Sequence, residues 1–336
     1  MMAIVGVETL VYGVDDVATS ARFFEDFGLD RIGGPDGEAR FALPEGSGVV
    51  IKSLTDPSLP GGSRVNGAGV HEVIWGVDTA ASLDVLVAGL AADRDVTRDT
   101  DGTAHFVSDF GVAMGLRLFA KKQVVSAPDP VNAPGHVRRL NQHRKWRLRA
   151  RPKVIAHVVF AVPDYEAGYA FMRDRLNFRL SDSQRGFGKY LRADGSYSHH
   201  SLLLLNANAP VPEMDGTLRF HHANFGVEDI DEVMVGANYM FRKQWPSSHF
   251  GLGRHRIDSA LFYYLPCPAG GEAEYGADTD YVDDSWVPRD WVEPLFGFSH
   301  FVHNLPPFLA EEPQWKFNYL TDGTAPVDAA GEDLHA

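Results

Sequence analysis

The chain has 336 residues, a formal net charge of -14, 44% hydrophobic and 23% charged residues, and a single cysteine, Cys267. This length allows two domains of ordinary size, and the composition is typical of a water-soluble globular protein. The negative charge argues against nucleic acid or an anionic membrane as the partner. The sequence has no apolar run of ~18 residues and no signal-peptide pattern, so we expect neither a transmembrane helix nor a secretory signal. One cysteine excludes an internal disulfide, which fits a cytoplasmic protein.

The first predicted element is a strand at residues 9–16, which ends in an acidic turn before an amphipathic helical pattern. The same order of strand, acidic turn and helix returns at residues 72–79, 157–164 and 222–229. The second occurrence follows the first by 63 residues, and the fourth follows the third by 65. Such spacing indicates internal repeats. We therefore predict an α+β protein of four similar units, each a strand, a helix and several short strands, paired into two halves.

A proline-rich loop and a basic run separate the two halves. We predict a structural domain, a linker, a second domain and a tail over residues 1–125, 126–152, 153–300 and 301–336. The basic run from Arg138 to Lys153 allows an anionic partner, but we prefer a solvated linker that offsets acidic neighbours on the same chain. The aromatic residues after Tyr281 are expected to pack across the second domain or into a subunit contact.

Two histidines occupy matching places in the second half. His157 and His222 each begin a predicted strand, with a valine five residues on and an aspartate seven residues on. The neighbouring His221 should point to the opposite face of its strand. Glu274 follows a Pro-x-Gly turn in the last strand of the fourth unit. Two imidazoles and one carboxylate form the set that holds Fe(II) by one face. The alternative is that each histidine is an ordinary buried or surface residue, but the matched offsets favour a metal site.

A third histidine is a candidate for proton transfer. His200 lies in a strand-like segment where alternation places it on the same face as Leu202. An imidazole titrates near neutral pH, so it can take up and return a proton. His199 is the competing choice for this role.

Two further residues precede the carboxylate. His255 could hydrogen-bond an oxygen at the metal, and Tyr264 lies ten residues before Glu274, an even offset. Tyr263 should face the other way. Both tyrosines could instead be core aromatics of a strand, and no role is assigned to His249.

The first half lacks this set of residues. Its equivalent positions carry Thr9 and Glu72, and the predicted strand at residues 109–119 places no carboxylate where Glu274 would be. We therefore expect the first half to be structural and the second half to carry the metal. The sequence contains no P-loop, no Cys-x-x-Cys pair and no Gly-x-Ser-x-Gly motif.

The segment at residues 253–276 resembles the closing signature of the type I extradiol ring-cleavage dioxygenases of the vicinal oxygen chelate superfamily, the group that includes 2,3-dihydroxybiphenyl 1,2-dioxygenase. Its Gly-x-His, apolar-Tyr, Pro-x-Gly and Glu elements are spaced as in that family. The His157 strand and the histidine pair ending in His222 also match. The resemblance covers residues from about 153 to 300 well, and the first half by unit pattern only.

The resemblance implies four βαβββ modules in two domains and a dioxygenase that cleaves a catechol-type ring with O2 in aromatic compound catabolism. It implies His157, His222 and Glu274 as ligands of Fe(II), with Mn(II) as a possible substitute, and His200 as the acid/base. Exposed strand edges further predict a homo-oligomer.

The resemblance also implies that His255 and Tyr264 contact bound substrate and that Asp258 supports the site. The sequence departs from the family pattern at Tyr263, at Cys267 and in a long loop at residues 206–216, which leaves the substrate open. Alternative functions are a hydroquinone-cleaving dioxygenase, a lyase or isomerase using another divalent metal, or a non-catalytic binding protein. Binding proteins of the superfamily lack the metal set.

Overall fold

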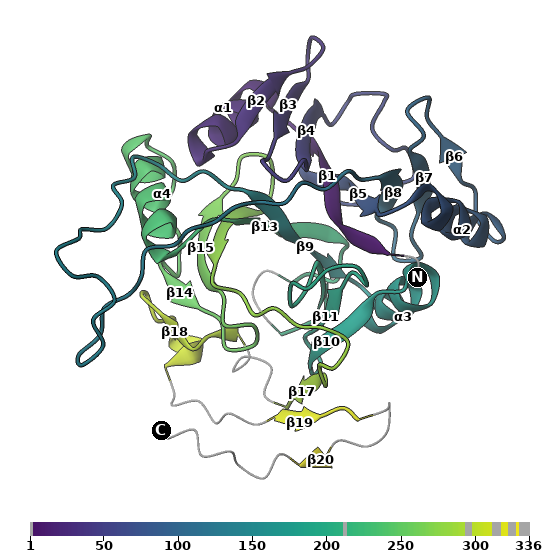
Figure 1. The fold of residues 1–336 in the computed structure, drawn as a ribbon. Coiled ribbons are helices and arrows are strands. Elements are labelled where there is room, and N and C mark those ends of the chain that lie inside the picture. The colour runs from purple at the N-terminus through teal and green to yellow at the C-terminus, as the bar shows by residue number, and fades with distance from the viewer. Residues whose placement is uncertain (1–2, 211–213, 293–297, 311–316, 322–326, 329–336) are drawn as a thin grey trace.

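The computed structural model describes residues 3–210, 214–292, 298–310, 317–321 and 327–328 (Figure 1). The elements of the first half are β1 (Ile4–Val14), α1 (Val17–Phe27), β2 (Asp30–Gly33), β3 (Ala39–Ala42), β4 (Gly48–Ser53), β5 (Gly69–Val77), α2 (Ala80–Ala91), β6 (Thr97–Arg98), β7 (Ala104–Val107) and β8 (Ala113–Leu118). These elements run as strand, helix and three strands, twice in succession. They form the first two of the four expected βαβββ modules.

The second half repeats this order. Its elements and those of the tail are β9 (Val154–Val162), α3 (Tyr165–Leu176), β10 (Arg179–Gln184), β11 (Gly188–Arg192), β12 (Leu202–Asn206), β13 (Arg219–Gly226), α4 (Ile230–Arg242), β14 (Gly253–Arg254), β15 (Leu261–Pro266), β16 (Glu272–Ala277), β17 (Arg289–Trp291), β18 (Phe301–Val302), the 3-10 helix η1 (Pro307–Leu309), β19 (Phe317–Tyr319) and β20 (Val327–Asp328). The α+β prediction with four modules is confirmed.

The helices begin where the acidic turns of the sequence predicted. Asp16 accepts a hydrogen bond from a backbone N–H in the first turn of α1, and Asp164 does the same for α3. Such caps satisfy donors that a helix leaves unpaired, and each contributes about 0.5–2 kcal/mol. Helix α1 ends at Gly28, whose φ of 117° is open to glycine at little cost. None of the helices in the described residues combines the length and hydrophobicity needed to cross a bilayer.

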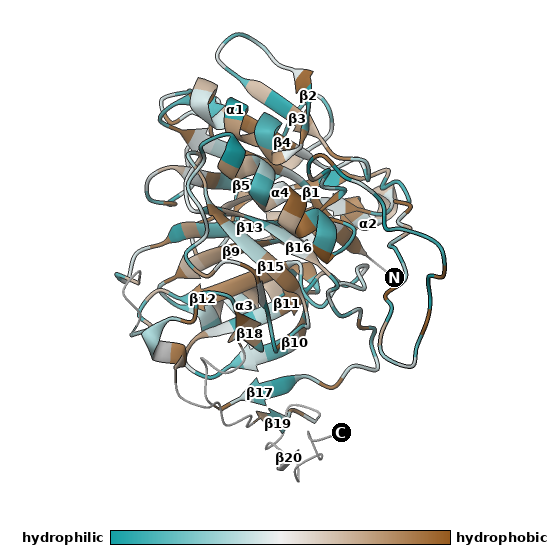
Figure 2. Cartoon of the chain, turned by 90° about the vertical axis from the view of Figure 1, so that its left-hand side faces the viewer, coloured by the Kyte–Doolittle hydropathy of each residue, from teal (hydrophilic) through white to brown (hydrophobic). Residues whose placement is uncertain are grey.

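Each half builds a mixed sheet around one antiparallel pair of strands. In the first sheet the order is β2-β3-β4-β1-β5-β8-β7-β6, so β1 and β5 lie at the centre. In the second sheet β9 and β13 take these places, and the tail strands extend both edges. Figure 1 shows the two halves one above the other, with α1 beside α4 and α2 beside α3. In Figure 2 the central strand β9 is largely hydrophobic, whereas β17 is hydrophilic.

The two halves share one hydrophobic core. The rings of Phe27 and Tyr275 stack across the boundary with centroids 4.0 Å apart, and the Tyr275 hydroxyl donates to the Phe27 carbonyl at 2.7 Å. Tyr12 and Phe220 make an edge-to-face contact at 5.5 Å in the same boundary. The first half is therefore part of the packing that supports the second.

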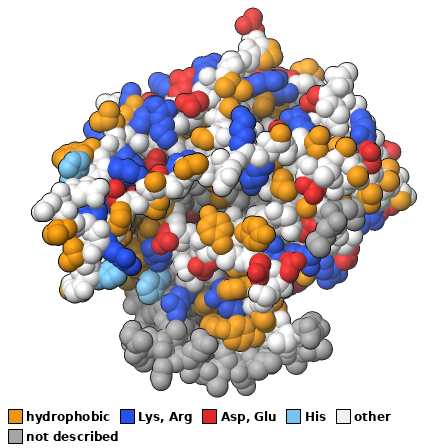
Figure 3. All heavy atoms as spheres, viewed as in Figure 1, with side chains coloured by type: hydrophobic (Ala, Val, Ile, Leu, Met, Phe, Trp, Pro, Cys, Tyr) orange, Lys and Arg blue, Asp and Glu red, His pale blue; other side chains and the backbone are white. Residues whose placement is uncertain are grey.

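The basic linker lies against an acidic corner of the second half. Lys145 and Lys153 each contact one oxygen of Glu228, at 2.7 and 2.8 Å, and Arg147 contacts Glu228 at 3.1 Å. Partial burial would raise the pKa of Glu228, but hydrogen bonds from the two lysines outweigh this effect and lower the pKa to about 2. On the face shown in Figure 3, basic and acidic side chains are interleaved rather than gathered into one patch.

The segment after the fourth module packs on the second half through its first strand. Strand β17 pairs in parallel with β10, and Trp291 within it is buried. The Trp286 indole N–H donates to the Ser181 carbonyl at 2.8 Å. Part of the tail aromatic set, Phe296, lies outside the described residues, as does most of the segment from Gly323.

Candidate metal centre

Strand register brings the predicted ligands of the second half to one face of the sheet. His157 on β9 lies opposite Asn224 on β13, Asn224 lies opposite Glu274 on β16, and Glu274 lies opposite Tyr264 on β15. Paired residues of neighbouring strands point to the same face, and His222 lies two residues before Asn224 on that face. Residues far apart in the sequence thus meet across four adjacent strands.

Three donor atoms converge at this place. His157 Nε2 and His222 Nε2 lie 3.3 Å apart, and each lies 3.4 Å from Glu274 Oε2. His157, His222 and Glu274 are 7%, 5% and 0% exposed, so little water can reach the carboxylate. A single ion about 2.0–2.2 Å from each donor, the distance typical of imidazole and carboxylate ligands, fits a triangle of this size.

The Glu274 carboxylate supports a cation at this position. Both of its oxygens are buried and lack a hydrogen-bond partner of acceptable geometry among the described residues. An unpaired buried carboxylate costs several kcal/mol, so such groups normally meet a cation or a set of donors. Two neutral imidazoles and one carboxylate are also the donor types that suit a divalent transition metal. The residues present therefore fit a divalent metal ion.

The charges of the site keep its ligands in metal-binding form. Burial alone would raise the pKa of Glu274, but the imidazoles of His157, His255 and His222 that face it hold the pKa well below its ordinary value. Burial also lowers the pKa of His222, and the nearby His221 and His157 add to this effect. At neutral pH Glu274 is therefore ionised and His222 is neutral, which are the forms that bind a metal.

His200 lies against the triad. Its ring stacks on that of His157 with centroids 4.1 Å apart, and its Nδ1 is 3.7 Å from Asp258 Oδ2. Burial lowers the pKa of His200 well below its ordinary value, and neighbouring histidines reinforce the shift, so the imidazole is neutral at pH 7. His199 faces away from the triad, toward Tyr190 and Trp286. Of the two sequence candidates, His200 is the one beside the predicted metal ligands.

His255 and Tyr264 form a pair on the other side of the triad. The His255 Nε2 and Tyr264 Oη atoms lie 3.0 Å apart, and His255 Nδ1 is 2.5 Å from the Phe298 carbonyl oxygen. Burial would lower the pKa of His255, but Glu274 and Asp258 outweigh it and raise the pKa. Burial raises the pKa of Tyr264 far above its ordinary value, so its hydroxyl keeps its proton.

Two orientation arguments from the sequence were wrong. His221 does not point away from His222, because the pairing of β13 shifts register between Phe220 and His222 and the two Nδ1 atoms lie 2.7 Å apart. A bulge of this kind breaks the two-residue period. His200 does not share a face with Leu202, because it precedes β12, where alternation does not apply. Leu202 faces the shared core, whereas His200 faces the triad.

Sequence reasoning missed Asp182. This residue of β10 is fully buried, and its Oδ2 lies 3.1 Å from His199 Nε2. Arg289 of β17 pairs with the same carboxylate. Asp182 stands among ordinary polar residues and carries no motif, so no local signal could have identified it. His199, His200 and Asp258 also form a second cluster of possible metal ligands.

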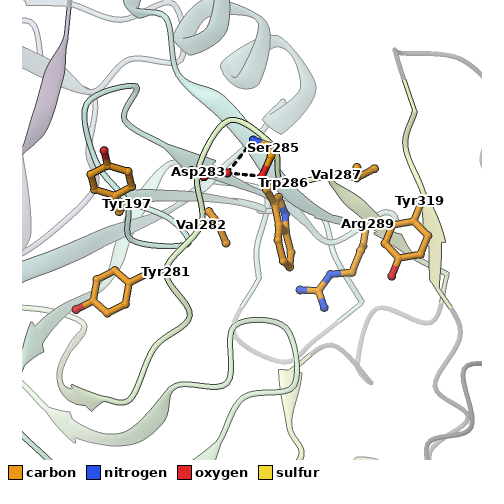
Figure 4. A pocket seen from close by; sticks show the side chains of 9 residues that line it. All are labelled: Tyr197, Tyr281, Val282, Asp283, Ser285, Trp286, Val287, Arg289 and Tyr319. Carbon is orange, nitrogen blue, oxygen red and sulfur yellow. Dashed lines mark hydrogen bonds between the residues drawn. The ribbon is translucent and has the colours of Figure 1, made fainter.

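A surface pocket of about 780 Å³ lies behind His199 rather than at the triad. Trp286 lines this pocket, and the centroid of its ring lies 6.0 Å from that of the His199 ring. The Arg289 guanidinium lies over the Trp286 ring, 4.8 Å from its centroid. Figure 4 shows Trp286 and Arg289 side by side in this pocket, with Tyr197 and Tyr281 at its other end. None of the six residues predicted as ligands or catalytic groups lines it.

The equivalent place in the first half holds no such triad. The same register there aligns Thr9 with Ile74 and Ile74 with Gly115, the positions of His157, Asn224 and Glu274. Glu72 takes the place of His222 and contacts His105 Nδ1 at 2.6 Å. Within the described residues, the triad of possible ligands therefore occurs in one half of the repeat.

Comparison with known proteins agrees with this geometry. Residues 154–237 match the Glyoxalase/Bleomycin resistance protein/Dioxygenase superfamily. The chain is 33% identical over 146 residues to Metapyrocatechase 2 of Cupriavidus necator, covering 43% of each chain. It is 35% identical over 149 residues to an iron-dependent extradiol dioxygenase of Rhodococcus jostii (strain RHA1), covering 40% of this chain and 47% of the relative. The chain thus aligns with less than half of the length of these relatives.

Among solved structures, the Mn(II)-bound glyoxalase from Novosphingobium aromaticivorans superposes with a TM-score of 0.70 at 19% identity, covering 94% of this chain and 96% of that one. This likeness shows that both halves share its fold. Residues 154–237 therefore resemble the Glyoxalase/Bleomycin resistance protein/Dioxygenase superfamily, and the chain as a whole has the vicinal-oxygen-chelate fold.

Proposed function

We propose that the chain is an Fe(II)-dependent extradiol dioxygenase that cleaves a catechol-type aromatic ring with O2, in the catabolism of aromatic compounds. The observation that carries the proposal is the buried Glu274 carboxylate, which faces two imidazole nitrogens at 3.4 Å and receives no hydrogen bond of acceptable geometry from the part of the chain that the structure describes. The names of the sequence relatives, an iron-dependent extradiol dioxygenase and a metapyrocatechase, supply the reaction class. We also propose the domain roles, with residues 1–125 structural, 126–152 a linker, 153–300 catalytic and 301–336 a tail.

Fe(II) held by His157, His222 and Glu274 would supply coordination positions at which a diol and O2 can react. The protein residues around it would position and protonate the substrate. A neutral His200 can accept the proton of a substrate hydroxyl and return it later. His255 and Tyr264, on the other side of the triad, would hydrogen-bond a substrate oxygen and hold the ring in place.

We also propose the identity of the metal, the substrates, the cellular compartment and the assembly of the protein. Fe(II) is preferred and Mn(II) is the substitute, since both suit two imidazoles and a carboxylate. The substrates are a small aromatic diol and O2. We place the protein in the cytoplasm as a homo-oligomer, because strands at the sheet edges need a cover.

The test is O2 uptake by protein loaded anaerobically with Fe(II) and offered catechol, methylcatechols, 2,3-dihydroxybiphenyl and hydroquinone. We expect stoichiometric O2 consumption with at least one catechol and a yellow ring-opened product. Mn(II)-loaded protein and protein without metal serve as controls. Absence of O2 uptake with every diol, in protein that retains one ion per chain, would refute the proposal.

A metal-dependent isomerase or lyase is the second candidate, because one full-length structural neighbour is a Mn(II)-bound glyoxalase. Such an enzyme would act on its substrate without consuming O2. Uptake of O2 only with hydroquinone would point instead to a hydroquinone-cleaving dioxygenase. A non-catalytic binding protein would show neither reaction.

A further inference from the structure

A chain of buried polar groups leads away from His200 on the side remote from the metal ligands. The Nδ1 atoms of His200 and His199 lie 3.2 Å apart, and His199 Nε2 lies 3.1 Å from Asp182 Oδ2. His200 is 5% exposed, and His199 and Asp182 are 0% exposed. Water therefore does not compete for these contacts, and each hydrogen must lie on one specific nitrogen.

The contacts of Asp182, at the far end of this series, determine which atom donates and which accepts in each hydrogen bond. Asp182 receives hydrogen bonds from the backbone N–H of Arg289 at 2.7 Å and from its guanidinium at 2.5 and 3.1 Å. A carboxylate that accepts from so many donors is ionised and can only accept. His199 Nε2 must therefore carry the hydrogen that it shares with Asp182.

The remaining hydrogens follow in turn. A neutral imidazole has one N–H, so His199 Nδ1 is an acceptor, and His200 Nδ1 must donate to it. Asp258 Oδ2, 3.7 Å from His200 Nδ1, also favours a hydrogen on that nitrogen. His200 Nε2, on the other side of the ring, is then left with a free lone pair.

We propose that Asp182 is a positioning residue that acts through His199 to hold His200 in the Nδ1–H tautomer, so that its Nε2 is ready to accept a proton. This inference rests on the proposed function for its use in catalysis, but the tautomers themselves are a property of the protein alone. Arg289 belongs to β17, after the fourth module, so the segment that follows the modules completes the arrangement.

A second metal ion is the competing use of His199, His200 and Asp258, whose donor atoms lie close together. The contacts of Asp258 argue against it. Its Oδ1 accepts from the Ala260 N–H at 3.2 Å, and its Oδ2 accepts from the Thr279 hydroxyl at 3.3 Å.

The experiment is 15N NMR of metal-free protein labelled at histidine, with signals assigned by His199→Gln and His200→Gln variants. In the wild type we expect the hydrogen on Nε2 of His199 and on Nδ1 of His200. The opposite tautomer at either residue would overturn the proposal. This measurement needs neither a substrate nor a variant of Asp182, so it stands if the proposed dioxygenase activity fails.

Asp182→Asn tests causation, because its amide N–H faces His199 Nε2 and should reverse both tautomers. In metal-loaded protein we expect kcat to fall about 10-fold or more, with KM and metal content near wild type. Asp290→Asn is the matched control, since it removes the neighbouring carboxylate, which pairs with Arg185, and leaves His199 untouched. Unchanged tautomers in folded Asp182→Asn protein, or a second bound ion lost in His199→Gln, would contradict the assignment.

Discussion

At the scale of single residues, Glu274 is a buried carboxylate with two imidazole nitrogens 3.4 Å away. Among the described residues, neither of its oxygens receives a hydrogen bond of acceptable geometry. Burial of an ionised group is unfavourable unless a charge or a set of donors compensates it. A cation held by His157, His222 and Glu274 would supply such compensation.

Replacing Glu274 by Gln should affect both metal binding and stability. We expect loss of the bound ion, because a neutral amide is a poor ligand, and lower thermal stability of the metal-free protein at neutral pH, because the fold holds the pKa of Glu274 well below its ordinary value and so favours the ionised form. Elemental analysis and thermal unfolding measure the two effects. Glu272→Gln, the same change two residues earlier on β16, should retain the ion. Full metal content in Glu274→Gln would show that the ion, if present, binds elsewhere.

At the scale of elements, strand pairing and turns decide where the site residues meet. The Pro-x-Gly turn before β16 is one example. Gly270 has φ 100°, and a Cβ at this position would lie 2.1 Å from the Ala68 carbonyl oxygen in the first half. The turn that leads into the Glu274 strand is thus fitted against the other half of the molecule.

Gly270→Ala should therefore destabilise the protein beyond the cost of its backbone angle. A positive φ alone costs a non-glycine residue about 1–3 kcal/mol, and the clash with Ala68 adds to this. Gly186→Ala is the control, because Gly186 has φ 73° and open space around it. Denaturant unfolding should show a clearly larger loss for Gly270→Ala. Equal losses of stability in the two variants would mean that the contact between Gly270 and Ala68 accommodates a Cβ without measurable cost.

The linker is held by charge, and its contribution should depend on pH. The pKa of Glu228 is about 2 in the folded protein against an ordinary value of 4.5, so its stabilising effect is complete above pH 4.5 and is lost as pH falls toward 2. Glu228→Gln should lower the thermal midpoint at pH 7 and differ less from wild type at lower pH. Glu25→Gln, which removes an exposed pair with Arg31, should have little effect at either pH. A deficit that does not change with pH would exclude the ionic explanation.

At the scale of the whole molecule, the first half lacks the triad but supplies part of the core. Phe27 is fully buried, and its ring stacks on Tyr275, the neighbour of Glu274 in β16. The strand that carries the carboxylate is thus supported on its opposite face by the first half. This arrangement explains why a half without metal ligands can still be needed for the site.

Phe27→Ala should destabilise the entire chain. Removal of a buried phenylalanine typically costs about 3–5 kcal/mol, and the shared core predicts that both halves still unfold in one transition. Guanidinium unfolding followed by near-ultraviolet circular dichroism measures the loss. Phe241→Ala, at an exposed position of α4, should be close to neutral. Two separate unfolding transitions, of which Phe27→Ala shifts the midpoint of only one, would show that the halves fold independently.

The repeat, the strand-helix order and the acidic caps were predictable from the sequence, because they depend on patterns within about ten neighbouring residues. The triad candidates could be named for the same reason, since the two histidines repeat the same local offsets. The orientations of His221 and His200 were predicted wrongly, because a bulge and a strand boundary interrupt alternation without leaving a local trace.

The sequence by itself determined the modules, their caps and the residue types that can bind a metal, since these follow from local spacing and side-chain chemistry. Tertiary structure alone decided that Asp182 lies behind His199, that Arg289 of β17 completes this contact, and that Tyr275 rests on the other half. Asp182 and His199 are 17 positions apart, and the other two contacts join residues 107 and 248 positions apart. They depend on the register and packing of whole sheets, which no local pattern encodes.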